Sequence, residues 1–259
     1  MDWSKAKTIL ILTFLLLDLF LGYQIIHSYN RDRAGMPQGE LIPSSMEELL
    51  QSRHIKLAVD IPAGTPEMYY LYVRFTGFTG HMAKLTGQSE TESQGNGVIV
   101  TFDGPLLVPN SEDRMDLLKF MEPYIPFSSD YLYDTRSSST YTAHYVQTYQ
   151  RYPLFSVPMD IRMKGSRVFG YSQTHVQIIS QGNGRRVIPA LTAVRTLLDN
   201  GYIRYGESIS DISIGYYGHM YDADIQVLAP VWRIIHTNGM QYVNGITGAI
   251  EQIPVLEKK

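Results

Sequence analysis

The stretch TAHYVQTYQRYPLFSVPMDIRMKGSRVFGYSQ, residues 142–173, alternates strand-like runs with short turn-forming steps. Aromatic and β-branched residues are frequent in these runs, as they are in the strands of half-buried sheets. EDRMDLLKFMEPYIPFSSDYLYD, residues 112–134, precedes it and begins with a helical pattern. We therefore predict a helix, a strand and then a hairpin that is entered at the step Pro153-Leu154-Phe155.

The same layout returns near the C-terminus. Residues 189–217, PALTAVRTLLDNGYIRYGESISDISIGYY, predict a helix with Pro189 in its first turn and Gly201 at its end, followed by a strand. Residues 223–248, ADIQVLAPVWRIIHTNGMQYVNGITG, predict a hairpin entered at Pro230-Val231-Trp232. The fold class is α+β, with two related modules of antiparallel sheet and one packed helix each. The predicted modules span residues 44–175 and 176–259.

The pentapeptide SQGNG occurs at Ser93–Gly97 and again at Ser180–Gly184. Glycine-rich loops can cradle phosphate when they open a helix, and Asn-Gly also forms tight turns. The first copy lies between two strand-like runs. The second copy precedes a helix, but no Lys-Ser or Lys-Thr pair follows its glycines. Both copies are interpreted as turns, and neither aligns with the repeat.

The start of the first module predicts a short helix and then strands. Ser44 or Ser45 is expected to cap the helix SMEELLQSRHI. IKLAVDIP and MYYLYVRFTGF are expected to be strands because of their β-branched and aromatic content. TGQSETESQGNG is expected to be a polar connection to a further strand, VIVTFDG.

An apolar run from Thr8 to Ile26 contains one charged side chain, Asp18. At about 1.5 Å per residue it spans most of a roughly 30 Å hydrocarbon core. A cleaved signal peptide and a buried core helix are the alternatives, but no small-x-small cleavage site follows the run. We predict a cytoplasmic head at residues 1–7, a transmembrane anchor at 8–27 and a linker at 28–43. Lys5 and Lys7 favour a cytoplasmic N-terminus, which places the C-terminal region outside the cell.

Asp18 lies near the middle of this predicted span. A carboxylate at that depth costs roughly 2.5–3.5 kcal/mol, so it usually faces protein or water. Gly22, one turn later, would let a second helix approach closely. Either the face contacts a partner's membrane helix, or Asp18 is protonated and tolerated. The hypothetical interface consists of Ile11, Phe14, Asp18, Gly22 and Ile25.

Composition and motifs argue against an enzyme. The net charge of -3 lacks the basic footprint of a nucleic-acid binder. The absence of cysteine excludes disulfides and thiolate chemistry. No HExxH or G-x-S-x-G pattern occurs, and His219, Asp222 and Asp224, the best metal candidates, have the composition of an ordinary loop. We therefore predict no catalytic residues, no metal and no cofactor.

The opening MDWSKAKTILILTFLLLDLFLGYQ resembles the start of the YycI (WalI) proteins of the YycH/YycI family. Residues 187–218, VIPALTAVRTLLDNGYIRYGESISDISIGYYG, and 228–251, LAPVWRIIHTNGMQYVNGITGAIE, extend the resemblance. The P-V-W-R-I and Y-V-N-G-x-T-G elements are also similar to the last strands of PepSY-type modules. The resemblance covers both ends of the chain, and the middle matches mainly in length and layout.

The resemblance implies a single-pass membrane protein with an extracytoplasmic α+β region and no catalytic residues. Such proteins act with their paralogue YycH on the sensor histidine kinase WalK of the WalK/WalR (YycG/YycF) two-component system, partly through their membrane helices. That system controls cell-wall metabolism, and the resemblance leaves open whether the kinase is activated or inhibited.

A second hypothesis is an extracytoplasmic PepSY-like module that binds or inhibits a peptide, a protease or a cell-wall fragment. Trp232 and Tyr242 would lie in its contact surface. The alternative for these two rings is packing within the sheet.

Overall fold

The computed structural model describes residues 7, 13–15, 17–18, 20, 42–78, 89–94, 96–109, 113–219, 221 and 223–252, with the backbone alone for 42–45 and 89–94. The chain divides into two compact units, Met1–Ser52 and Arg53–Lys259. Most of the predicted anchor, residues 8–27, and of the predicted linker, 28–43, lies outside the described residues. Within the described part, no helix is both long and apolar enough to cross a membrane.

The helix α2, Ile42–Ser52, belongs to the first unit. It begins before Ser44 and Ser45, so the prediction that one of these serines precedes the helix as its cap is wrong. Pro43 lies in the first turn, where its missing N–H leaves no helical hydrogen bond unmade. The helix ends at Ser52, ahead of the predicted Arg53-His54-Ile55.

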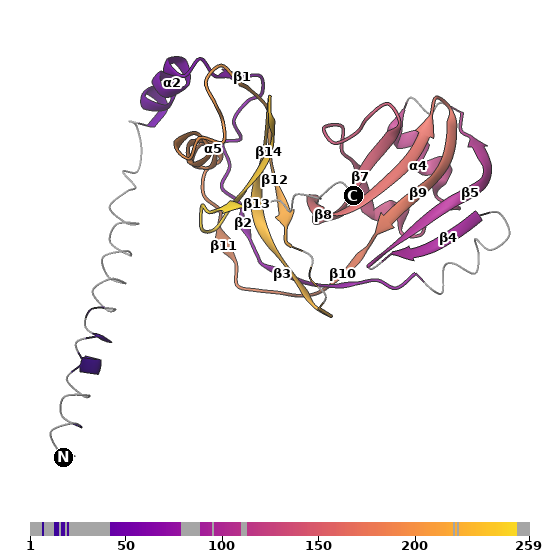
Figure 1. Cartoon of the computed structure of the whole chain (residues 1–259), viewed down its shortest axis with the longest axis horizontal. Coiled ribbons are helices and arrows are strands. Elements are labelled where there is room, and N and C mark those ends of the chain that lie inside the picture. Colours follow the sequence, from indigo (N-terminus) through magenta and orange to yellow (C-terminus); the bar gives the residue numbers. More distant parts are fainter. Residues whose placement is uncertain are drawn as a thin grey trace. The chain divides into compact units, whose positions relative to one another are not determined.

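The second unit is dominated by strands, with few helices (Figure 1). Its helices are α4 (Arg114–Met121), the 3₁₀ turn η1 (Ser128–Asp130) and α5 (Ala190–Asp199). Its first strands are β1 (Lys56–Leu57), β2 (Glu67–Met68), β3 (Leu71–Phe75), β4 (Ser89–Gln94), β5 (Gly97–Leu107), β6 (Tyr131–Tyr133), β7 (Thr142–Tyr149) and β8 (Tyr152–Lys164). The remaining strands are β9 (Arg167–Thr174), β10 (Val176–Gln181), β11 (Arg185–Arg186), β12 (Ser208–Tyr217), β13 (Gln226–His236), β14 (Gly239–Asn244) and β15 (Ile250–Glu251).

Within the described residues, hydrogen bonds connect 13 of these strands into one sheet. Its main path runs β10-β3-β13-β12-β8-β9-β5-β4, while β11 and β2 form a separate two-stranded sheet. Most neighbours are antiparallel, as predicted. The two parallel pairings are β1 with β12 and β8 with β12.

Both halves of the sheet show the predicted order of helix, strand and hairpin. α4 precedes the antiparallel strands β7, β8 and β9, and α5 precedes β12, β13 and β14. Pro153 lies at the start of β8, but Pro230 lies inside β13. The prediction that a proline step opens both hairpins is therefore correct only for the first.

The first SQGNG segment forms the predicted turn, whereas the second is an extended connection and not a turn. The first joins β4 to β5, with Gln94 paired to Gly97. The second ends β10 and leads to β11, and α5 begins only at Ala190. The polar segment before the first turn was expected to be a connection, but its residues 89–94 form the strand β4. An edge strand needs backbone hydrogen bonds from one neighbour, and that pairing overrides weak β-propensity.

β3 connects residues from the two predicted modules. Leu71 and Val73 of this strand are fully buried, and β3 pairs with both β10 and β13. IKLAVDIP, expected to be a full strand, contributes only the two residues of β1. The boundary between residues 175 and 176 stays a prediction, but the pairing shows that an early strand completes the C-terminal part of the sheet.

Each of the two α-helices of this unit, α4 and α5, buries one apolar face. Leu117 and Met121 of α4 pack in a cluster with Val100, Tyr145 and Ile161. In α5 the buried residues are Ala190, Ala193, Val194, Leu197 and Leu198. Full burial of one such large apolar side chain contributes about 1.5–3 kcal/mol, so these faces fix each helix to the sheet.

Candidate interaction surface

The described part of the predicted membrane-helix face includes Phe14 and Asp18. Both are helical and exposed. Ile11, Gly22 and Ile25 lie outside the described residues. Leu15, Leu17 and Phe20 are also helical, apolar and exposed. Large exposed apolar surfaces mark interaction with a partner or a membrane.

Trp232 is buried in the sheet, with 1% of its surface exposed. Its indole Nε1–H donates a hydrogen bond to the backbone oxygen of Ile188, at 2.9 Å. That carbonyl lies just before α5, so the indole connects β13 to the start of the helix. Sheet packing, one of the two alternatives for this ring, is its role in the structure.

Tyr242 also lies in the interior, in a cluster with Phe155, Tyr217 and Val231. Its ring stacks on Tyr217 with centroids 4.3 Å apart and lies 5.4 Å from the ring of Phe155. Burial raises the pKa of the Tyr242 hydroxyl, so the phenol stays neutral. Neither Trp232 nor Tyr242 therefore presents a ring at the surface of the folded chain.

Arg233, which follows Trp232 in β13 and pairs with Tyr242 across the ladder, forms an ion pair that the sequence did not reveal. Its guanidinium is buried and forms two hydrogen bonds with the carboxylate of Asp134, which is also buried. It also lies 3.4 Å from Asp211 and 4.4 Å above the centre of the Phe155 ring. Arg233 is in β13 and Asp134 follows β6, so the pair joins the two halves of the sheet.

The ion pair also controls the protonation of Asp134. Burial alone would raise the pKa of this carboxyl, but hydrogen bonding and the positive charge of Arg233 outweigh it. The Ser137 hydroxyl and the backbone N–H of Arg136 donate further hydrogen bonds to the same carboxylate. The resulting pKa lies below its ordinary value, so the pair stays charged in neutral solution.

His175 forms a second set of contacts between the two halves of the sheet. Its Nδ1 lies 2.8 Å from the Thr76 hydroxyl and its Nε2 lies 3.0 Å from Asp130. The imidazole stacks on Phe127, with ring centroids 4.2 Å apart. Hydroxyl, imidazole and carboxylate also occur together in catalytic triads. Here the buried ring is covered by Phe127, so we interpret the arrangement as a structural link between β3, β10 and η1.

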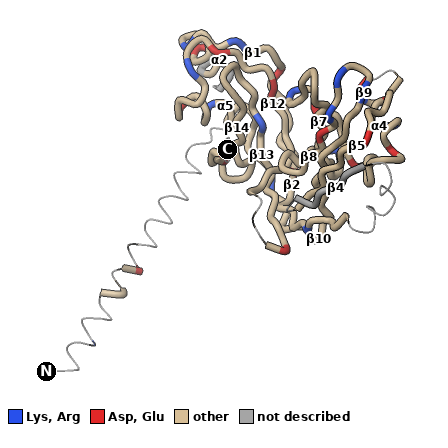
Figure 2. The backbone as a smooth tube through the Cα atoms, turned by 45° about the vertical axis from the view of Figure 1, so that its right-hand side comes forward, with Lys and Arg blue, Asp and Glu red and all other residues tan. Residues whose placement is uncertain are grey.

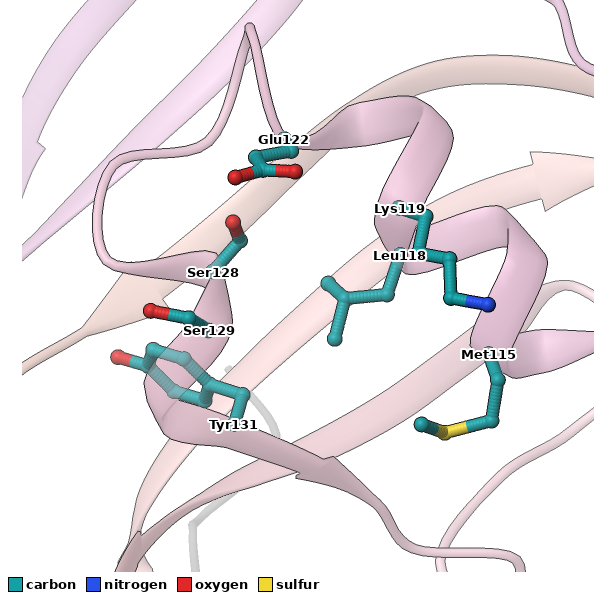
Figure 3. Close-up of a pocket in the computed structure, with 7 residues that line it drawn as sticks. All are labelled: Met115, Leu118, Lys119, Glu122, Ser128, Ser129 and Tyr131. Carbon is teal, nitrogen blue, oxygen red and sulfur yellow. The ribbon is translucent and has the colours of Figure 1, made fainter.

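A small pocket lies between α4 and η1 (Figure 3). Its volume is about 210 Å³, below the roughly 300–1,000 Å³ of most small-molecule sites. Leu118 and Met115 of α4 face Tyr131 and the η1 serines across it. The pocket has room for one apolar side chain. Its lining residues are Met115, Leu118, Lys119, Glu122, Ser128, Ser129 and Tyr131.

His219, Asp222 and Asp224, interpreted above as residues of an ordinary loop, lie between β12 and β13 in the chain. Asp222 lies outside the described residues, and no described group of three or more His, Asp or Glu side chains is arranged to hold a metal ion. His219 packs edge-on against Tyr217, with centroids 5.7 Å apart.

Basic and acidic positions are interspersed along much of the described backbone (Figure 2).

Comparison with known proteins identifies the family rather than a ligand. The family model described as YycI protein matches residues 40–246. No curated protein sequence matches the chain. An uncharacterized protein from Eubacterium rectale ATCC 33656, known from a crystal structure, has a TM-score of 0.53 at 9% identity, covering 80% of this chain and 98% of that chain. The Bacillus megaterium YpeB C-terminal domain has a TM-score of 0.38 at 10% identity, covering 85% and 99%. The first of these likenesses is one of fold alone.

Proposed function

Because this chain belongs to the YycI family, a regulatory and non-catalytic family, we propose that it modulates the WalK (YycG) sensor histidine kinase together with YycH. The family match over residues 40–246 is the observation that carries this proposal. The proposed effect of this regulation is on the cell-wall homeostasis signalling that the kinase controls. The proposed function includes no enzymatic step by this chain.

In this proposal the chain is a single-pass membrane protein. The apolar run from Thr8 to Ile26 supports the anchor, and Lys5 and Lys7 support a cytoplasmic N-terminus. The second unit then lies outside the cell. Two PepSY-like modules are part of the same proposal, supported by the helix and antiparallel strands in each half of the sheet.

The proposed regulatory surface is the helix face that carries Asp18. A regulator shifts a kinase between signalling states only if it binds those states unequally. A carboxylate within the hydrocarbon provides such a preference, because its burial cost falls when one kinase state offers it a hydrogen-bonding partner. Gly22 on the same face would allow that partner helix to come close.

The packing of the second unit, Arg53–Lys259, favours a role in positioning the membrane helix over a ligand site around Trp232 and Tyr242. Both rings are buried, and the Arg233–Asp134 pair lies within the same sheet. A peptide or cell-wall fragment would have to displace packed side chains to reach them. We therefore give the binding or inhibitor hypothesis for these residues no further part in the proposal.

Pull-down from detergent-solubilised membranes tests the proposal. Tagged wild-type protein is compared with Asp18→Leu, with Leu17→Ala as a neighbouring control off the proposed face, and with a chain carrying an unrelated membrane helix. We expect wild type and Leu17→Ala to retain WalK and YycH, and the helix swap to lose WalK. Loss of WalK by Asp18→Leu would place the carboxylate in the contact. Recovery of neither partner by wild type would overturn the proposed function.

A further inference from the structure

β10 is the outermost strand at one end of the main path of the sheet. It pairs with β3 on its inner side, and Figure 1 shows the two strands side by side. Beyond the second SQGNG segment, β11 continues the ribbon by pairing with β2. An edge strand with free backbone groups can accept another strand.

The outer side of β10 already carries one peptide-like group. The side-chain amide of Gln147 accepts a hydrogen bond from the Val176 N–H at 2.9 Å and donates one to the Val176 carbonyl at 2.8 Å. The amide therefore occupies the place of a neighbouring strand's peptide group. In an antiparallel ladder the bonding direction alternates along the strand, so the backbone groups of Ile178 also point outward.

A β-bulge then widens the exposed surface. Ile178 pairs with Val73 and Ser180 with Tyr72, so the extra residue Ile179 projects from the ladder. Val227 of β13 pairs with the other side of Tyr72. The exposed fractions are 41% for Ile179, 39% for Tyr72 and 47% for Val227. This row across three strands is called the edge patch below.

Arginines lie on β3, within the strands of the edge patch, and on β11, which follows β10 in the chain. Arg74 pairs across the ladder with Gln177, and Arg185 and Arg186 follow on β11. All three are exposed, and no described carboxylate forms a salt bridge with them. Three carboxylates belong to the same region: Glu67 is paired with Arg186, Asp130 is bonded to His175, and Asp224 lies two residues before Gln226, which pairs with Val73 beside Arg74.

Arg151 adds a fourth guanidinium, at the tip of the hairpin between β7 and β8. Gln150 and Arg151 both have left-handed backbone conformations, with φ of 49° and 72°. They are the two central residues of the hairpin loop that Tyr149 and Tyr152 close, where left-handed conformations are the usual turn geometry. The Tyr149 hydroxyl before this turn accepts a hydrogen bond from the Gln181 side chain, which holds the tip beside the end of β10.

We propose that β10 binds an extended acidic segment of a partner protein by strand addition. Backbone hydrogen bonds on the outer side of Ile178 would supply affinity, the edge patch would pack against alternate apolar side chains, and the four arginines would select carboxylates. The site lies outside the predicted membrane helix. The strand-addition proposal is therefore independent of the proposed kinase contact, and each can fail without the other.

The test uses the full chain in mild detergent and two synthetic peptides, (Glu-Val)₄ and (Lys-Val)₄. We expect saturable binding of (Glu-Val)₄ by calorimetry, slower exchange of the Ile178 amide, and no saturable binding of (Lys-Val)₄. Arg74→Glu combined with Arg151→Glu should weaken binding about tenfold, since two surface ion pairs can supply that factor. Arg167→Glu, an exposed arginine at the start of β9, is the matched control and should bind like wild type.

Two further variants examine the edge itself. Ile178→Pro removes an outward N–H, and Ile179→Asp places a charge in the edge patch without altering the ladder. Loss of (Glu-Val)₄ binding by a folded Ile179→Asp chain supports the proposal even if Ile178→Pro fails to fold. Equal binding of both peptides, no binding of either, or unchanged binding by Ile179→Asp would refute it. A wild-type dimer that Ile179→Asp dissociates would instead identify a second copy as the occupant.

Discussion

Arg233 forms a buried ion pair that connects two distant parts of the chain. It belongs to the P-V-W-R-I element, which indicated a family but not a role for its guanidinium. Its partner Asp134 is 99 residues away along the chain, and both side chains are buried. A buried ion pair is weak evidence of net stabilisation, but removal of one partner leaves the other charge without compensation.

Arg233→Met is therefore expected to destabilise the chain by about 3–5 kcal/mol, since Asp134 would remain buried without its cation. Urea unfolding followed by circular dichroism measures the change. The matched control is Arg195→Met, which removes the exposed pair with Asp199 and should cost about 0.5 kcal/mol or less. Equal effects of the two substitutions would contradict the role given to Arg233.

The same pair predicts a dependence of stability on pH. Burial opposes ionisation of Asp134, but the Arg233 contacts prevail and lower its pKa below the ordinary 3.8. A depressed folded-state pKa contributes stability that is present above the unfolded value and is lost as pH falls through the folded value. The unfolding free energies of wild type and Asp134→Asn should therefore converge below about pH 4. Parallel curves from pH 7 to pH 2 would rule out this contribution.

At the scale of elements, the two halves of the sheet meet where β12 crosses β8. The contact is one parallel pair, Tyr216 with Leu154. The adjacent Gly215 allows this approach, because a Cβ there would lie 2.5 Å from the Pro153 carbonyl oxygen and 2.6 Å from the Phe155 ring. The sequence places Gly215 in a predicted strand but does not show that another strand crosses it.

Gly215→Ala should consequently destabilise the chain by about 1–3 kcal/mol through overpacking at the crossing. Gly104→Ala is the control, because a Cβ at that glycine of β5 meets nothing within 4 Å. Its effect should stay within about 0.5 kcal/mol. Thermal unfolding of both variants measures the difference, and a neutral Gly215→Ala would show that β8 and β12 can separate freely.

Trp232 tests how α5 is fixed to β13. Trp232→Phe removes the indole N–H and leaves the Ile188 carbonyl without its donor, at an expected cost of about 1–3 kcal/mol. Chemical unfolding measures the loss. Tyr242→Phe is a useful comparison, because it keeps the stacked ring on Tyr217. A smaller effect of Trp232→Phe than of Tyr242→Phe would argue against the indole hydrogen bond as the link.

The whole second unit depends on a strand from its early part. β3 pairs with β10 on one side and with β13 on the other, and it buries Leu71 and Val73 completely. Without β3, the inner edge of β10 loses its hydrogen-bonding partner. Stability in this part of the sheet therefore comes from residues far apart in the chain.

Residues 176–259 alone are accordingly expected not to fold cooperatively, whereas residues 53–259 should. Circular dichroism melts and limited proteolysis distinguish the two fragments. A sigmoidal melt of 176–259 would show that the predicted second module is self-sufficient. The comparison also tests the module boundary, since an autonomous module must contain all the strands that bury its core.

The sequence alone determined the local elements of this protein and its family. Helix periodicity in residues 189–201, the hairpin signals and the first SQGNG turn depend on neighbours a few positions away, so they can be read along the chain. Only the tertiary structure placed β3 between β10 and β13, paired Arg233 with Asp134, and buried Trp232 and Tyr242. Polar residues 89–94 became a strand for the same reason. These outcomes require contacts between distant residues, and local propensity carries no information about which distant strand will supply the partner.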